Sequence, residues 1–256
     1  MIIAILQARV SSSRLPEKVL KPILSRSMLQ HQLDRIKNSK LIDILVVATS
    51  LDKSDDKIEQ ICLNESVICF RGSLNDVLDR FYHTAKKFNA STIVRLTGDC
   101  PLTDPEVIDK VIQYYVDNDF DYVSNTLNPT YPDGLDVEVF SFESLEKAWS
   151  SAKLPSQREH VTPFIKENFK VGEVKNKIDL SYLRWTVDEL EDFDFVTKVY
   201  EKLYEINPNF GFQDILNLLN KYPELNLVNS KFERNEGYKK SLIEDNFYIN
   251  EKVKNA

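Results

Sequence analysis

The chain has 256 residues, 42% of them hydrophobic and 29% charged, which is the balance of a globular protein with a substantial core. Its net charge of −7, with no basic stretch, argues against a nucleic acid as partner. Its three cysteines lack the spacing of a zinc site or a disulfide framework, and its apolar N-terminal run is too short for a signal peptide or a membrane span, so we expect a cytoplasmic protein.

Strands and helices alternate through the first half of the sequence. Short apolar runs predict strands at residues 1–6, 42–49, 66–70, 92–97 and 120–124. Apolar residues at helical spacing predict helices at residues 28–37, 55–63, 74–88 and 105–116. This alternation predicts an α/β fold with a mostly parallel sheet and right-handed crossovers.

The second half alternates less regularly. Apolar and acidic residues alternate at 135–140, as in a half-exposed strand, and two further strands at 169–175 and 182–187 are compatible with an antiparallel pair. Helices are predicted at residues 142–152, 157–168, 190–204, 212–221 and 233–241.

The turn after the first strand is rich in cations and hydroxyls. It holds Arg9, Arg14 and Lys18 together with three consecutive serines. Open α/β sheets bind ligands at the carboxyl ends of their strands, so this cluster predicts a polyphosphate site. The first glycine of the chain is Gly72, which excludes a Walker loop and a Rossmann fingerprint after this strand. A solvated basic loop is the alternative.

Two aspartates follow predicted strands. Asp99 comes after the strand at 92–97, next to Gly98, and Asp188 stands between the strand at 182–187 and a helix. An acid beside bound phosphates requires a cation between them, and Mg²⁺ typically takes one or two carboxylates together with phosphate oxygens. Helix capping is the alternative for each, although Asp104, just before Pro105, fills that role better than Asp99.

Five segments of the sequence carry a resemblance to one family of enzymes. They are residues 7–18, 98–102, 131–138, 158–163 and 187–192, and the resemblance spans roughly residues 1–200. These segments resemble the CMP-sugar synthetases, the cytidylyltransferases that activate acylneuraminate and 3-deoxy-manno-octulosonate, and are most similar to the SpsF-like branch of spore coat polysaccharide biosynthesis.

The resemblance implies nucleotidyl transfer on a Rossmann-like sheet of the glycosyltransferase-A type. An acceptor oxygen attacks the α-phosphorus of CTP and pyrophosphate leaves. Asp99 and Asp188 are expected to bind Mg²⁺, and Lys18, Arg14 and Asp99 to act in catalysis. The nucleotide site is expected to comprise Arg9, Ser12, Ser13, Arg14, Lys18, Gly98 and, toward the base, Arg71 or Arg80.

The acceptor pocket is expected in the irregular second half, from Asp133, Asp136, Glu138, Arg158 and His160. Arg158 suits the carboxylate of a sugar acid, whereas the three acids suit the hydroxyls of a polyol or amino sugar. His160 either contacts substrate or bonds a backbone carbonyl.

The resemblance also implies a domain arrangement and a homodimer. We expect a nucleotidyltransferase domain over residues 1–222. Within it, an excursion at about 125–180 contains a small hairpin and serves the acceptor and dimerisation. A C-terminal helical extension covers residues 223–256.

Three departures from the family pattern leave the acceptor open. The first loop has serines where many members carry a glycine, Cys100 stands where octulosonate enzymes have an acid, and the late motif has only Asp188 where acylneuraminate enzymes often use Asp-x-Asp. Two other functions stay open. A glycosyltransferase-A-type enzyme using a nucleotide-sugar donor would normally show an Asp-x-Asp, and a non-catalytic nucleotide-binding protein should have lost a metal ligand.

Overall fold

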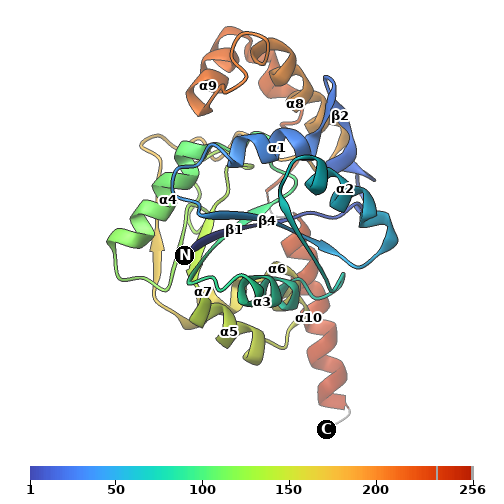
Figure 1. The fold of residues 1–256 in the computed structure, drawn as a ribbon, viewed down its shortest axis with the longest axis vertical. Helices are drawn as coiled ribbons and strands as arrows, with labels where there is room; N and C mark the ends of the chain where they lie inside the picture. The colour runs from blue at the N-terminus through green and yellow to red at the C-terminus, as the bar shows by residue number, and fades with distance from the viewer. Residues whose placement is uncertain (235, 255–256) are drawn as a thin grey trace.

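The computed structural model describes residues 1–234 and 236–254, and these contain a seven-stranded sheet with helices on both faces (Figure 1). From one edge to the other, its strands are β5 (Ile68–Gly72), β4 (Ile44–Ser50), β1 (Ile2–Gln7), β6 (Thr92–Thr97), β8 (Glu138–Ser141), β7 (Tyr122–Ser124) and β9 (Val171–Glu173). Strand β8 is antiparallel to both neighbours, and the other adjacent pairs are parallel. The predicted mostly parallel α/β fold is confirmed.

Two apolar cores lie on opposite faces of this sheet. Along β1, Ala4 and Leu6 belong to one core, and Ile3 and Ile5 belong to the other. A strand buried on both faces is apolar throughout, as the N-terminal run is. The first core is covered by α1 (Met28–Ile36), α2 (Asp56–Asn64), α4 (Pro105–Asp117), α8 (Leu190–Leu203) and α9 (Phe212–Lys221), and the second by α3 (Val77–Lys87), α5 (Phe142–Ser151) and α7 (Pro163–Asn168).

Strand β8 differs from its prediction. It was expected to be half-exposed, yet it lies between β6 and β7, and Glu138 is only 4% exposed. An acidic residue at alternate positions therefore did not mark a solvent face. Its charge is instead paired inside the protein, as described below.

The predicted helix at 157–168 is two helices, α6 (Pro155–His160) and α7. Val161 between them has a φ of 68°, a left-handed conformation that interrupts the helix, and Pro163 then begins α7. Proline is compatible with the first turn of a helix but not with its interior.

The predicted antiparallel pair at 169–175 and 182–187 is wrong. Strand β9 pairs with β7 in parallel, and residues 182–187 make a single parallel bridge, between Arg184 and Asp133. An antiparallel hairpin is present elsewhere, between β2 (Pro22–Ile23) and β3 (Arg26–Ser27).

The chain ends in a long helix, α10 (Glu236–Lys254), which packs against α6 and extends past the body of the molecule (Figure 1). It is longer than the predicted helix at 233–241. The predicted division at residue 223 stays a prediction, and positions 235, 255 and 256 of that extension lie outside the described residues. Among the described helices, none has the length and apolar character needed to cross a membrane.

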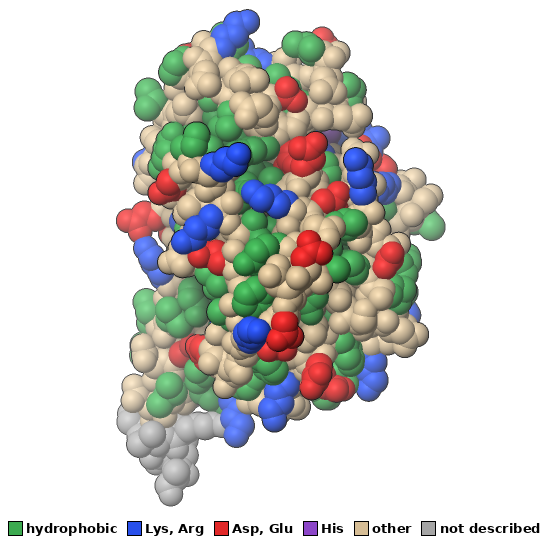
Figure 2. Space-filling view, turned by 90° about the vertical axis from the view of Figure 1, so that its left-hand side faces the viewer, with side chains coloured by type: hydrophobic (Ala, Val, Ile, Leu, Met, Phe, Trp, Pro, Cys, Tyr) green, Lys and Arg blue, Asp and Glu red, His purple; other side chains and the backbone are tan. Residues whose placement is uncertain are grey.

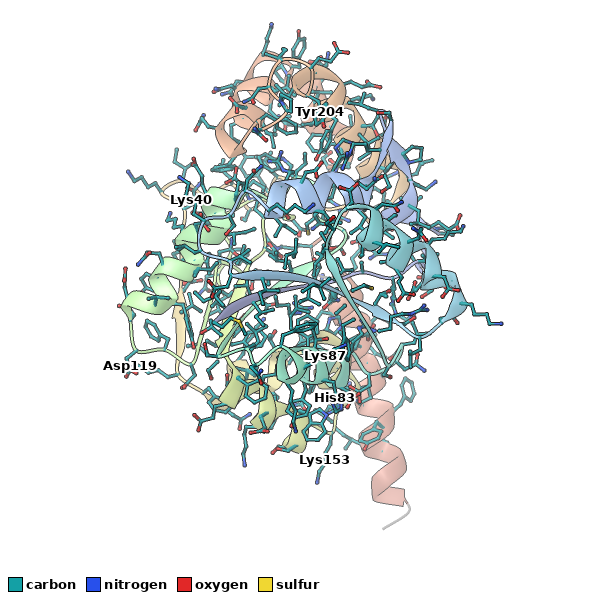
Figure 3. The ribbon with its side chains drawn as sticks, viewed as in Figure 1. Lys40, His83, Lys87, Asp119, Lys153 and Tyr204 are labelled. Atoms are coloured by element: carbon teal, nitrogen blue, oxygen red, sulfur yellow. The ribbon has the colours of Figure 1, made fainter. Side chains whose placement is uncertain are left out.

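Acidic and basic side chains are mixed on the face shown in Figure 2. Figure 3 labels His83 on α3, and its side chain is half-exposed. Tyr204 packs edge-on against His31, which is buried. Both histidines therefore have the surface or packing roles that their helical positions predict.

Candidate active site

A cleft of about 730 Å³ opens where β1 and β6 end. Residues from the N-terminal turn, from the segments after β6 and before α8, and from the start of α10 line it. The predicted site residues that it brings together are Arg9, Ser12, Ser13, Arg14, Lys18, Gly98, Asp99, Asp133, Asp136, His160 and Asp188.

The basic turn is held in place by a buried carboxylate. Asp55 is 1% exposed and accepts hydrogen bonds from the backbone N–H groups of Val10, at 2.7 Å, and Ser50, at 3.0 Å. Asp55 ends a 3₁₀ helix, η2 (Lys53–Asp55), and on the sequence it looked like an ordinary acid at a helix start. Its role depends on the distant Val10, so no local signal could have identified it.

Gly98 brings the ends of β1 and β6 into contact. Its N–H donates to the carbonyl of Gln7 at 2.8 Å, and a Cβ on Gly98 would lie 3.0 Å from both Ala8 Cβ and that carbonyl. The glycine therefore permits close approach of the backbone.

Asp99 and Asp188 converge on Lys18. The backbone N–H of Val187 donates to the carbonyl of Asp99 at 2.7 Å, which joins the two acid-bearing segments. Lys18 Nζ lies 2.9 Å from Asp188 Oδ1 and 3.5 Å from Asp99 Oδ2, and it donates to the Val187 carbonyl at 2.7 Å. Lys18 begins another 3₁₀ helix, η1 (Lys18–Leu20).

The charges in this cluster support one another. Burial alone would lower the pKa of Lys18, but the Asp99 and Asp188 carboxylates hold it above its ordinary value. Burial alone would raise the pKa of Asp99, but Lys18 and hydrogen bonds from Thr97 and Cys100 hold it below its ordinary value. Both groups are therefore charged at neutral pH.

The two carboxylates fit a magnesium ion. They face one cation, Lys18, so their positions favour positive charge between them. Among the described residues, no group of three or more His, Cys, Asp or Glu side chains is arranged to hold a metal. Mg²⁺ commonly takes one or two carboxylates and completes its shell with phosphate oxygens and water, which matches this pair beside a basic turn.

Arg9 and Arg14 differ in how they are engaged. Arg14 makes ion pairs with Asp188 at 2.9 Å, Glu236 at 3.1 Å and Glu189 at 3.5 Å. Arg9 is exposed and has no ion pair with any described residue. Arg9 is therefore available to an anionic ligand without breaking a contact.

Arg80 lies close to Arg9 and lines the same cleft. It is 2% exposed and donates to the carbonyl of Ser73 at 2.6 Å, while its Nε has no partner among the described residues. Burial and then the charge of Arg9 lower the pKa of Arg80 to about 10. This wall of the cleft therefore favours an anion.

A second set of acids lines the cleft from the loop after β7. The N–H of Asp133 donates to the carbonyl of Leu183 at 2.9 Å. Only a glycine fits at the next position, Gly134 (φ 111°), because a Cβ there would lie 2.6 Å from Thr186 N. This contact fixes the loop beside the segment that carries Asp188.

Two arginines partner these acids. Arg184 lies 3.4 Å from an oxygen of Asp133, and Arg234 makes an ion pair with Asp136. Burial, and then the nearby Asp136, raise the pKa of Asp133 to about 7, while burial also raises the pKa of Asp136. Arg184 and Arg234 were both missed on the sequence, because each is recognisable only by its partner.

Three predicted site residues do not line the cleft, and the first is Arg71. Its guanidinium donates to the backbone carbonyls of Ser50 and Asp52 and makes ion pairs with Asp56, at 2.7 Å, and Glu59, at 2.9 Å. Arg71 therefore ties β5 to α2, and the expectation that it reads the base is corrected.

Glu138 is the second. Its carboxylate pairs with Arg95 and with Lys166, at 3.0 Å, and accepts from Tyr122, at 2.7 Å, and Thr162, at 2.6 Å. Burial alone would raise the pKa of Glu138, but Lys166 and Arg95 lower it strongly. The Glu138 carboxylate is therefore the centre of a buried network of ion pairs and hydrogen bonds, and it does not belong to the pocket for the sugar acceptor.

Arg158 is the third. Its Nε lies 2.9 Å from Asp76, and its NH1 donates to the carbonyl of Trp149 at 2.8 Å. Asp76 is also the N-cap of α3, so Arg158 links α6 to α3 and is not free for a sugar carboxylate.

Three further residues named from the sequence are His160, Cys100 and Asp104. His160 lines the cleft, with Nε2 at 2.9 Å from Ser241 Oγ, and burial lowers its pKa to about 4. Cys100 is buried, which raises the pKa of its thiol well above the ordinary value and disfavours the reactive thiolate. Asp104 caps α4, accepting from Glu106 N at 2.9 Å.

Known proteins resemble this chain over most of its length. A family model described as "Cytidylyltransferase" matches residues 3–237. An uncharacterized protein of Methanocaldococcus jannaschii is 44% identical over 90% of this chain and 94% of its own length. The spore coat polysaccharide biosynthesis protein SpsF of Bacillus subtilis is 34% identical over 87% and 95%. The solved structure of a cytidylyltransferase from Leptospira borgpetersenii has a TM-score of 0.84 at 35% identity, covering 88% of this chain and 96% of that one.

Proposed function

The chain belongs to the cytidylyltransferase family, and we propose that it transfers CMP from CTP to a sugar or sugar-acid acceptor, releasing pyrophosphate, for polysaccharide biosynthesis. The observation that carries the proposal is the convergence of Asp99 and Asp188 on Lys18 beside the basic turn. Such a site can bind a metal and a triphosphate together, which is the requirement of nucleotidyl transfer.

The triphosphate is proposed to lie along the turn at residues 9–18. Arg9 is free to bind phosphate oxygens, while Arg14 and Lys18 exchange carboxylate partners for phosphate. Charge-assisted hydrogen bonds of this kind are short and strong. Ser12 and Ser13 add hydroxyl donors from the same turn.

The base is proposed to lie toward Arg80. Of the two arginines considered for this role, Arg80 lines the cleft, whereas Arg71 is engaged elsewhere. The Nε of Arg80 has no partner among the described residues, and a buried donor without a partner gains from a carbonyl acceptor.

Asp99 and Asp188 are proposed to hold Mg²⁺. When bound there, the ion neutralises charge on the phosphates and lowers the pKa of a nearby acceptor hydroxyl. The protein's own part is to orient the two substrates. The acceptor oxygen then forms a bond to the α-phosphorus while the bond between the α-phosphorus and the pyrophosphate oxygen breaks. Asp133 and Asp136 line the same cleft and offer acceptors for sugar hydroxyls.

The test is to incubate the protein with each nucleoside triphosphate, Mg²⁺ and a panel of sugars and sugar acids, and to follow pyrophosphate release. We expect release with CTP and only when an acceptor is present, loss of release with EDTA, and recovery when Mg²⁺ is restored. Pyrophosphate release from a different nucleoside triphosphate and not from CTP would contradict the assignment to CTP.

Two further outcomes point to the alternatives. Transfer from a nucleotide-sugar without pyrophosphate release would indicate a glycosyltransferase. CTP binding without turnover on any acceptor would indicate a nucleotide-binding protein. The proposed homodimer is tested separately by light scattering of the purified protein.

A further inference from the structure

The start of α10 forms one wall of the cleft. Glu236, Lys240 and Glu244 line it, and their spacing of four residues places them on one stripe of the helix. Most of α10 lies beyond residues 3–237, the part matched by the family model. Lys240 and Glu244 of this wall therefore lie outside the part of the chain that the family model matches.

Buried polar contacts fix α10 on α6. Ser241 is 3% exposed; its hydroxyl donates to Glu159 at 2.7 Å and lies 2.9 Å from His160 Nε2. Asp245 is 6% exposed and accepts from the N–H of Ser156 at 2.9 Å and from its hydroxyl at 2.6 Å. Contacts of this kind specify how a helix is oriented, because a buried polar group without its partner is costly.

The cations of the cleft divide into two classes. Among the described residues, Arg14, Lys18, Arg95 and Arg184 each have a carboxylate partner. The cleft-lining cations without an ion pair to a described residue are Arg9, Arg80 and Lys240.

These three cations come from two walls of the cleft. Arg9 and Arg80 lie close together on the nucleotide side, where the charge of Arg9 lowers the pKa of Arg80. Lys240 comes from α10. A cleft that gathers Asp99, Asp133, Asp136 and Asp188 would repel an anionic second substrate unless a cation met it. Lys240 lines the cleft and has no ion pair to a described residue, so its charge is available to bind such a substrate.

We propose that α10 is the acceptor-selecting wall of the cleft and that Lys240 binds the carboxylate of a sugar-acid acceptor, an inference that rests on the proposed function. Arg158, the residue expected in this role, is engaged by Asp76. Glu244, one turn along α10, offers an acceptor for a hydroxyl of the same sugar.

The test compares two adjacent lysines. Lys240→Ala should raise KM for the best sugar acid of the panel about tenfold, because a charge-assisted hydrogen bond is lost. The value of kcat and the affinity for CTP, measured by calorimetry, should stay unchanged, and Lys240→Arg should recover most of the loss. Lys239→Ala is the control, since Lys239 pairs with Glu233 and does not line the cleft.

Three results would overturn the inference while leaving CMP transfer intact. They are an unchanged KM in Lys240→Ala, a loss of CTP affinity in place of acceptor affinity, and a wild-type enzyme that uses neutral sugars but no sugar acid. The absence of pyrophosphate release from any triphosphate and acceptor with the wild-type protein would instead contradict the proposed function.

Discussion

The two halves of the cleft are built in different ways. On the nucleotide side, the turn after β1, Gly98–Asp99 after β6 and the segment before Asp188 are joined by backbone hydrogen bonds, such as Gly98 to Gln7 and Val187 to Asp99. On the acceptor side, a backbone hydrogen bond from Asp133 to Leu183 holds the loop, but the acids of that loop are paired with arginines far apart in the sequence, Arg234 with Asp136 and Arg184 with Asp133.

This difference decides which residues can be recognised in advance. Neighbouring parallel strands end at the same edge of a sheet, so residues after those strands come together whatever their side chains. No such rule says which side chains will form an ion pair. An arginine with the same sequence surroundings can bind a substrate or a neighbouring helix. Four experiments probe this contrast, in order of decreasing effect.

The largest effect is expected on the nucleotide side. Asp99→Asn or Asp188→Asn should lower turnover roughly a thousandfold or more, because metal binding at the phosphates contributes several kcal/mol to the transition state. Circular dichroism should show an intact fold. Asp119→Asn, at an exposed position labelled in Figure 3, is the matched control and should behave as wild type. Wild-type turnover in either site variant would remove that residue from the metal site.

Glu138 separates a core network from an acceptor group. Glu138→Gln should destabilise the protein by about 3–5 kcal/mol, because it leaves Arg95 and Lys166 without a buried counter-charge. Urea unfolding measures this loss. Asp136→Asn, in the cleft, should cost less stability. Wild-type stability together with a raised acceptor KM in Glu138→Gln would restore Glu138 to the acceptor pocket.

Arg9 and Arg71 form a matched pair of arginines. Arg9→Ala should weaken CTP binding by about 1.5–3 kcal/mol, or roughly 10- to 100-fold, since Arg9 has no ion pair within the described protein to lose. Arg71→Ala should leave CTP affinity unchanged, because Arg71 contacts α2. Calorimetry measures the affinity of both variants for CTP. Equal losses of affinity in the two variants would refute the assignment of Arg9, and not Arg71, to the CTP site.

The smallest effect concerns His160 and pH. Its pKa is about 4 in the folded protein and near 6.5 when unfolded, so the unfolded chain binds the extra proton between these values. The contribution of His160 to stability should therefore fall as pH drops from 6.5 toward 4, by on the order of 2 kcal/mol, whereas Asp133, whose pKa is raised to about 7, contributes with the opposite sign. His160→Gln should remove the His160 contribution from the dependence of Tm on pH. His83→Gln, at the half-exposed position in Figure 3, should leave it unchanged; equal slopes in all three proteins would argue against a buried neutral His160.

The sequence by itself determined the positions of the strands in the first half and the residues at the strand ends. Strand β6 has its predicted bounds, and the structure brings together Lys18, Asp99 and Asp188, which are all predicted site residues. Apolar periodicity reports local burial, and the parallel arrangement then brings the strand ends together.

Only the tertiary structure decided the roles of Glu138, Arg158 and Arg71, and the position of α10. Arg158 meets Asp76 across 82 positions of sequence, and Arg234 meets Asp136 across 98. A charged side chain carries the same signal in the sequence whether it will face solvent, a substrate or a buried partner. Which of these it meets depends on how distant elements pack, and packing is a property of the whole chain.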